Sequence, residues 1–143
     1  MKRRSPTTDI MEAQFGPVRA EVLLQTARRR EVLVRVRRTG QVLEYAVVSF
    51  EPAGTETYPA VHQEIRAGAL IGQAFRRAGA PFLREENAAT RVRLPKRLRD
   101  LFGTDEGHGL RIDAAILVGA DRLPYARNRE TYSPAIKWPD QVR

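Results

Sequence analysis

The chain has 143 residues, of which 42% are hydrophobic and 29% are charged, and these proportions are ordinary for one soluble globular domain. It contains no cysteine, and its two histidines, His62 and His108, lie far apart, so we expect neither disulfides nor thiolate catalysis nor a metal site. No apolar run approaches the ~20 residues that span a bilayer, and no apolar segment follows the basic start, as it would in a secretory signal. We therefore expect a cytoplasmic protein without membrane contact, a single domain over residues 1–143 in which residues 1–6 and 137–143 are flexible tails.

The net charge of +8 is carried mainly by arginine, which is spread along the chain. The charge alone leaves three interpretations open: a surface for nucleic acid, a field that attracts small anions, or a composition set by the source genome. No zinc-finger, RNP or bZIP pattern accompanies the arginines, and no row of aromatic residues offers a platform for stacked bases. Nucleic acid is therefore not an expected partner.

The first part of the chain predicts one helix followed by strands. A helix is predicted over residues 5–16, because Asp9 and Glu12 form a start signal and Gly16-Pro17 ends it. We expect the run from Arg28 to Arg30 to lie in a solvated connection. Apolar residues alternate with other residues, which predicts strands over residues 18–26, 31–38 and 41–50.

The middle of the chain predicts a loop over residues 51–58 and then two short helices, over residues 59–67 and 70–78. A glycine-bounded corner, Gly68 to Gly72, joins the two helices. Backbone N–H groups at the start of the second helix have no partner within that helix, so they favour an anion or a carbonyl oxygen. Close packing of the two helices is the alternative role for the glycines.

The last part predicts strands on either side of one helical turn at residues 95–102. A polar loop is expected at 104–109, and strands are expected over residues 82–87, 91–94, 112–118 and 123–133. Runs of strands with helices inserted between two hairpins are typical of an α+β fold with an antiparallel sheet.

The strand over residues 123–133 has an unusual composition. Alternation places Ala126, Asn128, Glu130 and Tyr132 on one side, so a carboxylate lies among small or hydrogen-bonding neighbours instead of a row of Val, Ile and Leu. Such a face suits the wall of a ligand pocket. A solvated Glu130 on an ordinary sheet edge is the alternative interpretation, because glutamate is mostly exposed in proteins.

Four short motifs, taken in order, resemble the chorismate lyase (chorismate pyruvate-lyase) family, whose fold is shared by the effector-binding domains of some transcription regulators. The motifs are Asp9-Ile10-Met11 with Phe15, Arg30-Glu31-Val32-Leu33 with Gly40, Gly68-Ala69-Leu70-Ile71-Gly72 with Phe75, and Arg129-Glu130 with Pro134. Each motif is short, and their order over about residues 9–135 carries the resemblance. It implies an antiparallel sheet with inserted helices that cover an internal ligand pocket.

The resemblance also implies a cofactor-independent carbon–oxygen lyase that removes pyruvate from chorismate and leaves 4-hydroxybenzoate. Glu130 would be the pocket acid beside the ether bond that breaks. The backbone amides of Met11 and Ile71 would hold oxygen atoms of the substrate, and Gly72 would complete the binding corner. A general acid at this place needs a raised pKa, which burial in an apolar cavity supplies.

The family's carboxylate-binding arginine lies on the strand after the hairpin turn, and residues 43–49 of this chain contain no arginine. A desolvated dicarboxylate needs a cationic clamp, for which a bidentate arginine is the usual choice. Arg84 is our candidate for that role, because the family also has an arginine near this position. A surface pair between Arg84 and Glu85 or Glu86 is the alternative. The loss of the family's arginine argues against lyase activity.

Two other functions fit the same fold. One is a cyclase or tailoring enzyme of secondary metabolism that acts on another small anionic or aromatic substrate, and the missing arginine favours it. The other is a non-catalytic small-molecule-binding module like the regulators' effector domains. Such domains normally act beside a DNA-binding helix-turn-helix, which the few residues before the first helix are too short to encode, so the sequence favours an enzyme.

Overall fold

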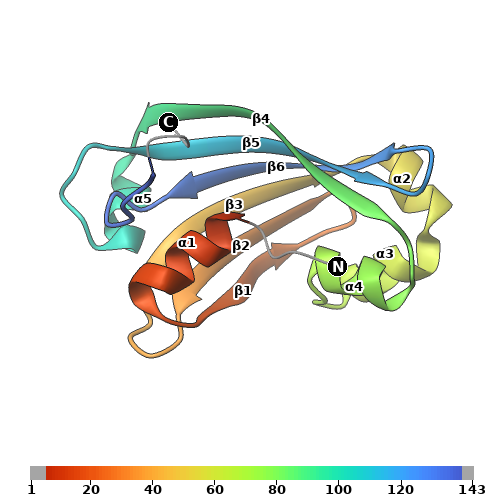
Figure 1. Ribbon diagram of the computed structural model, residues 1–143, viewed down its shortest axis with the longest axis horizontal. Coiled ribbons are helices and arrows are strands. Elements are labelled where there is room, and N and C mark those ends of the chain that lie inside the picture. The colour runs from red at the N-terminus through yellow and green to blue at the C-terminus, as the bar shows by residue number, and fades with distance from the viewer. Residues whose placement is uncertain (1–5, 140–143) are drawn as a thin grey trace.

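The computed structural model describes residues 6–139, which form one antiparallel six-stranded sheet with helices on both faces (Figure 1). The strands lie in the order β1-β2-β3-β6-β5-β4, so the last strand of the chain is a central one. Their bounds are β1 Val18–Gln25, β2 Arg29–Val36, β3 Val42–Phe50, β4 Phe82–Arg93, β5 His108–Val118 and β6 Leu123–Tyr132. The α+β class with an antiparallel sheet, predicted from the sequence, is confirmed.

The helices fill the connections that the sheet order requires. They are α1 Pro6–Phe15, α2 Pro52–Thr57, α3 Pro59–Arg66, α4 Ile71–Arg77 and α5 Lys96–Phe102. Helices α2, α3 and α4 carry the chain from β3 past the end of the sheet to the opposite edge, where β4 begins. Figure 1 shows α1, α3 and α4 on the side of the sheet nearer the viewer.

Apolar residues of β2 and β3 divide between the two faces of the sheet and anchor the helices. On one face, Met11 of α1 packs with Val36 and Tyr132 in one buried cluster, and a second cluster joins α3 and α4 to the same face. On the other face, Leu33 packs with Phe102 of α5. We call the face that contacts α1, α3 and α4 the helix-side face. The middle of this face, between its two apolar clusters, is occupied by polar and charged residues.

Two predictions about connections are wrong. Residues 51–58 were expected as a loop, but the structure forms α2 there, with Pro52 at its first position. Arg28 to Arg30 were expected in a solvated connection, whereas β2 begins at Arg29 and Arg30 is only 2% exposed. Arg30 donates from Nη2 to the carbonyl of Ala69 at 2.8 Å, and this bond holds the corner between α3 and α4.

The predicted strands at 82–87 and 91–94 are one strand, β4, whose pairing with β5 shifts at Asn87. The expected loop at 104–109 is shorter, because β5 already begins at His108. Trp138, expected in a flexible tail, packs edge-to-face on Tyr132 with ring centroids 4.9 Å apart. The remaining tail predictions, for residues 1–5 and 140–143, concern residues outside the described part. No helix within residues 6–139 has the length and apolar character needed to cross a membrane.

The glycine of α2 generates a stability prediction. A Cβ atom added at Gly54 would lie 2.6 Å from the carbonyl oxygen of Pro124 and 2.7 Å from Cα of Tyr125, and backbone atoms cannot swing away. Replacement of a helical glycine by alanine otherwise stabilises by about 1 kcal/mol. We expect the clash to reverse that sign, so that Gly54→Ala lowers the free energy of unfolding by about 1–3 kcal/mol in urea titrations. Gly107→Ala, which meets nothing within 4 Å, is the matched control and should change little.

Candidate functional site

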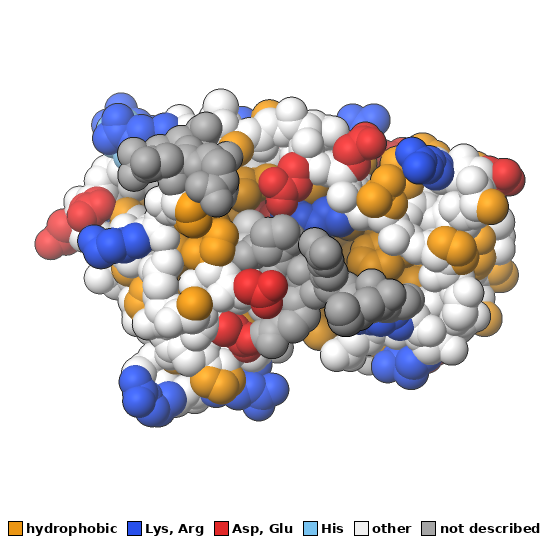
Figure 2. Space-filling view, in the orientation of Figure 1, with side chains coloured by type: hydrophobic (Ala, Val, Ile, Leu, Met, Phe, Trp, Pro, Cys, Tyr) orange, Lys and Arg blue, Asp and Glu red, His pale blue; other side chains and the backbone are white. Residues whose placement is uncertain are grey.

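The middle of the helix-side face carries charged and hydrogen-bonding residues between the two apolar clusters. We call this group the polar centre, and its members are Glu44, Arg84, Asn128, Glu130 and Tyr132. Alternation places these residues on the same face as the apolar residues that contact α1, α3 and α4. Figure 2 shows acidic and basic side chains among hydrophobic ones near the middle of this face.

The strongest contact in the polar centre is an ion pair between β4 and β6. Arg84 donates from Nη1 to Oε2 of Glu130 at 2.5 Å and from Nη2 to Oε1 at 2.7 Å, and Nη2 also reaches Glu86 at 3.1 Å. The side chain of Glu130 is 7% exposed and that of Arg84 is 16% exposed. Burial lowers the pKa of Arg84, but the bonds to Glu130 outweigh this effect and raise it. The guanidinium is therefore permanently charged and already engaged.

Glu130 has further donors around it. The hydroxyl of Tyr132 donates to Oε1 of Glu130 at 2.8 Å, and Nδ2 of Asn128 donates to Oε2 at 3.4 Å. Burial, together with the nearby carboxyls of Glu44 and Glu130, raises the pKa of Tyr132, so its hydroxyl keeps its proton and remains a donor. Glu130 therefore accepts hydrogen bonds on both of its side-chain oxygens.

Glu44 is a second carboxyl in the same place. It lies on β3 opposite Tyr132 and is 8% exposed. Burial and the negative charge of Glu130 raise its pKa well above the ordinary value, and the attraction of Arg84 does not compensate. Two buried carboxyls thus lie near one guanidinium, and the raised pKa of Glu44 favours its uncharged form.

The structure leaves two polar atoms of the centre buried without a partner among the described residues. They are Nε of Arg84, which is a donor, and Oδ1 of Asn128, which is an acceptor. Buried polar groups are normally hydrogen-bonded, so an unpaired donor and an unpaired acceptor in one group of residues fit a bound molecule that offers both.

The predicted site residues are only partly brought together. Glu130 and Arg84 contact each other directly. The alternative given by the sequence was a surface pair between Arg84 and Glu85 or Glu86, and the structure also contains the contact with Glu86. Met11 is buried against Tyr132, but it is the sixth residue of α1, so its N–H lies within the hydrogen-bonding pattern of the helix. The expected use of that amide for a ligand is not compatible with this conformation.

Ile71 and Gly72 occupy the first two positions of α4, where N–H groups lack a partner within the helix, as the sequence predicted. Ile71 packs against the apolar cluster of α3 and α4. A Cβ added at Gly72 would lie 3.3 Å from Nη2 of Arg76 and 3.4 Å from the ring of Phe82. The corner is therefore in contact with both charged and apolar side chains.

Glu44 is the residue that sequence reasoning missed. Its signal was present, since alternation over residues 41–50 places it beside Ala46 and Val48, which face inward. The sequence prediction for residues 43–49 concerned only the absence of an arginine and did not include Glu44, the one charged residue of this stretch.

The sheet order and the placement of the helices define an α+β domain with the fold of a ligand-binding domain found in bacterial transcription regulators. PhnF from Mycobacterium smegmatis matches with a TM-score of 0.69 and 13% identity, over 95% of this chain and 67% of that one. The ligand-binding domain of a regulator assigned to the GntR family, from Bordetella bronchiseptica, matches with a TM-score of 0.64 and 13% identity, over 88% and 92%.

A third similar structure is YydK from Bacillus subtilis, described as a possible transcriptional regulator, with a TM-score of 0.65 and 11% identity over 85% of this chain. The chain spans 60% of the length of that protein. The sequence itself matches no protein-family profile and no curated protein significantly. At these identities the likeness establishes the fold, and it confirms the resemblance to regulator domains at that level. The resemblance to chorismate lyase stays a prediction.

A double-mutant cycle tests the ion pair. We expect Arg84→Met to lower the free energy of unfolding by about 3–5 kcal/mol, because it leaves a buried carboxylate beside Glu44. Glu130→Gln should cost less, since Arg84 keeps Glu86, and the double variant should lose clearly less than the sum of the two. Additive losses in urea unfolding would contradict a direct pair.

The raised pKa of Glu44 predicts a pH dependence. In the unfolded chain Glu44 loses its proton above about pH 4, whereas in the native chain its raised pKa keeps the proton bound to higher pH. Glu44 therefore lowers the free energy of unfolding progressively as the pH rises from about 4 to the native pKa. Glu44→Gln removes this loss. The stability of the variant relative to the parent should therefore increase as the pH rises above about 4. A difference in stability that does not change with pH would contradict the assignment.

Proposed function

We propose that the chain is a small-molecule-binding domain without lyase activity, and that the polar centre receives a neutral or cationic ligand. Glu44 is the main support. It lies on β3, the strand on which the chorismate lyase family carries its carboxylate-binding arginine. The strand on which the resemblance places a cation thus carries a buried carboxyl instead, which favours a neutral or cationic ligand over an anion.

The charges of the polar centre argue against a dicarboxylate. Chorismate would bring two negative charges to a place that already holds the carboxyls of Glu44 and Glu130. The guanidinium of Arg84 has both terminal nitrogens on Glu130 and Glu86, so a second anion would have to displace them. A buried charge without a partner is costly, and like charges add to that cost.

A neutral or cationic ligand fits better. A neutral molecule with hydroxyl or amide groups would satisfy the unpaired Nε of Arg84 and Oδ1 of Asn128 without disturbing the ion pair. A cation would compensate the second carboxyl once Glu44 releases its proton. The fold agrees with a binding function, because one similar structure is described as the ligand-binding domain of a regulator.

An enzyme that uses Glu44 as a proton donor is the second candidate. A carboxyl whose pKa is raised well above its ordinary value by burial is the kind of group that general acid catalysis requires. This alternative replaces Glu130, the acid predicted from the sequence, because Glu130 is ion-paired. It corresponds to the tailoring enzyme considered above.

Two measurements test the proposal. Incubation with chorismate should release neither pyruvate nor 4-hydroxybenzoate, and turnover that is lost in Glu130→Gln would overturn the proposal in favour of the lyase.

In calorimetric titrations with benzamidine, benzamide and benzoate, which differ mainly in charge, we expect benzamidine to bind more tightly as the pH rises, because Glu44 must ionise. Glu44→Gln should remove that pH dependence and leave benzamide binding unchanged. Preferential binding of benzoate that depends on Arg84 would contradict the expected charge preference.

A further inference from the structure

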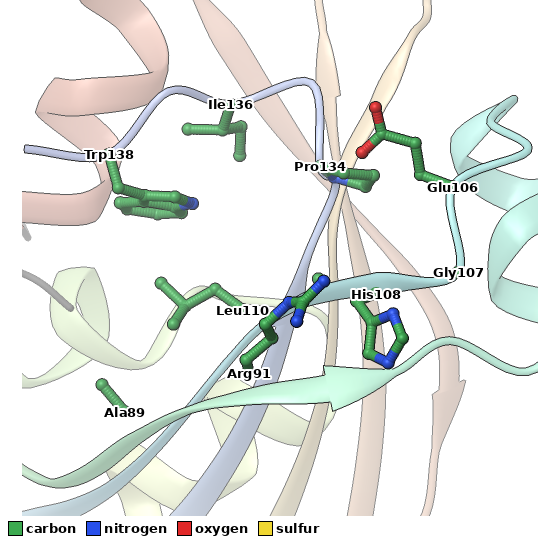
Figure 3. Close-up of a pocket in the computed structure, with 10 residues that line it drawn as sticks. Ala89, Arg91, Glu106, Gly107, His108, Leu110, Pro134, Ile136 and Trp138 are labelled. Carbon is green, nitrogen blue, oxygen red and sulfur yellow. The ribbon is translucent and has the colours of Figure 1, made fainter.

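A cavity of about 700 Å³ lies on the helix-side face at the end of the sheet where β4 ends and β5 begins. Figure 3 shows its position between these strands and the segment that follows β6. Leu110, Pro134, Ile136 and Trp138 form most of its apolar lining. None of these residues belongs to the polar centre, so the cavity is a separate feature of the molecule.

One side of this cavity carries an arginine that forms no ion pair with another residue of the described part of the chain. Arg91 extends from β4, and Figure 3 shows its guanidinium directed into the space, with His108 beside it. Among the ion pairs within residues 6–139, none involves Arg91. Glu106 also lines the cavity, but it forms no ion pair with Arg91 and its carboxylate lies on the side of Pro134 (Figure 3).

The aromatic residue of the cavity is held in place by the core. Trp138 packs edge-to-face on Tyr132, with the ring planes 79° apart, and Tyr132 is fully buried. The backbone of the same segment is tied to α1, because Gln14 accepts from the N–H of Lys137 at 2.9 Å and donates to its carbonyl at 2.6 Å. An indole fixed in this way offers a preformed surface for a flat apolar group.

We propose that this cavity is a second binding site, which takes a small carboxylate with a flat apolar body. The carboxylate accepts hydrogen bonds from the guanidinium of Arg91, whose planar fork matches the two oxygens. The body of the ligand packs on Trp138 and Leu110 and removes apolar surface from water. The preference for an anion is opposite to that proposed for the polar centre, so the two sites can be told apart by ligand charge.

The fluorescence of Trp138, the only tryptophan in the chain, reports directly on this site. Titration of the parent protein with benzoate should give a saturable change with a dissociation constant on the order of 1 mM. Benzyl alcohol, which has a similar shape but no charge, should bind about tenfold more weakly, because the charge-assisted bonds to Arg91 are lost.

Variants locate the binding. Arg91→Gln, at an exposed position, should weaken benzoate about tenfold, and Ala89→Glu should abolish binding by placing bulk and negative charge in the cavity. Arg28→Gln, at the turn between β1 and β2, is the matched control and should leave binding unchanged, as should Glu44→Gln.

The proposal is overturned if benzoate and benzyl alcohol bind equally, if Arg91→Gln has no effect, if Glu44→Gln alters benzoate binding, or if no saturable change is found. Circular dichroism of each variant distinguishes lost binding from lost folding.

Discussion

The ion pair between Arg84 and Glu130 is the contact around which the middle of the sheet is arranged. The two residues lie on β4 and β6, so their side chains meet across the intervening strand β5. Arg84 pairs with Ile116 of β5 and Glu130 pairs with Ile112, which leaves Ala114 between them. The small side chain of Ala114 lets the guanidinium and the carboxylate approach over β5, and a larger residue there would separate them.

This ion pair has an electrostatic consequence for its surroundings. Its carboxylate raises the pKa of Glu44 on β3 and that of Tyr132 on its own strand, in addition to the effect of burial. The protonated forms of both groups are thereby favoured, and together with Asn128 they surround the ion pair of Arg84 and Glu130 with three hydrogen-bonding groups. Such a set is suited to recognising a molecule by hydrogen bonds, and it resists a second anion.

The sequence predicted much of this arrangement because local patterns carry it. Alternation along β6 identified the face with Glu130, and the order of strands and helices indicated the α+β class. The ion pair was not predictable, since it depends on β4 and β6 lying on either side of β5 in a register that brings Arg84 near Glu130, and no local pattern specifies that register. Glu44 was missed for a different reason: an acidic residue on a strand is usually exposed, and the burial of this one results from tertiary packing.

Tyr132 connects the two sites. Its hydroxyl donates to Glu130 in the polar centre, while its ring packs against Trp138 at the wall of the cavity. Because the side chain of Tyr132 is fully buried, both contacts are made in the close-packed interior of the protein. The two sites are therefore neighbours that share one side chain, while the groups proposed to bind their ligands, Arg84 and Asn128 in one and Arg91 in the other, are separate. Tyr132 also accounts for the position of the segment after β6. That segment lies against the sheet because its Trp138 packs on the ring of Tyr132, whose hydroxyl belongs to the polar centre.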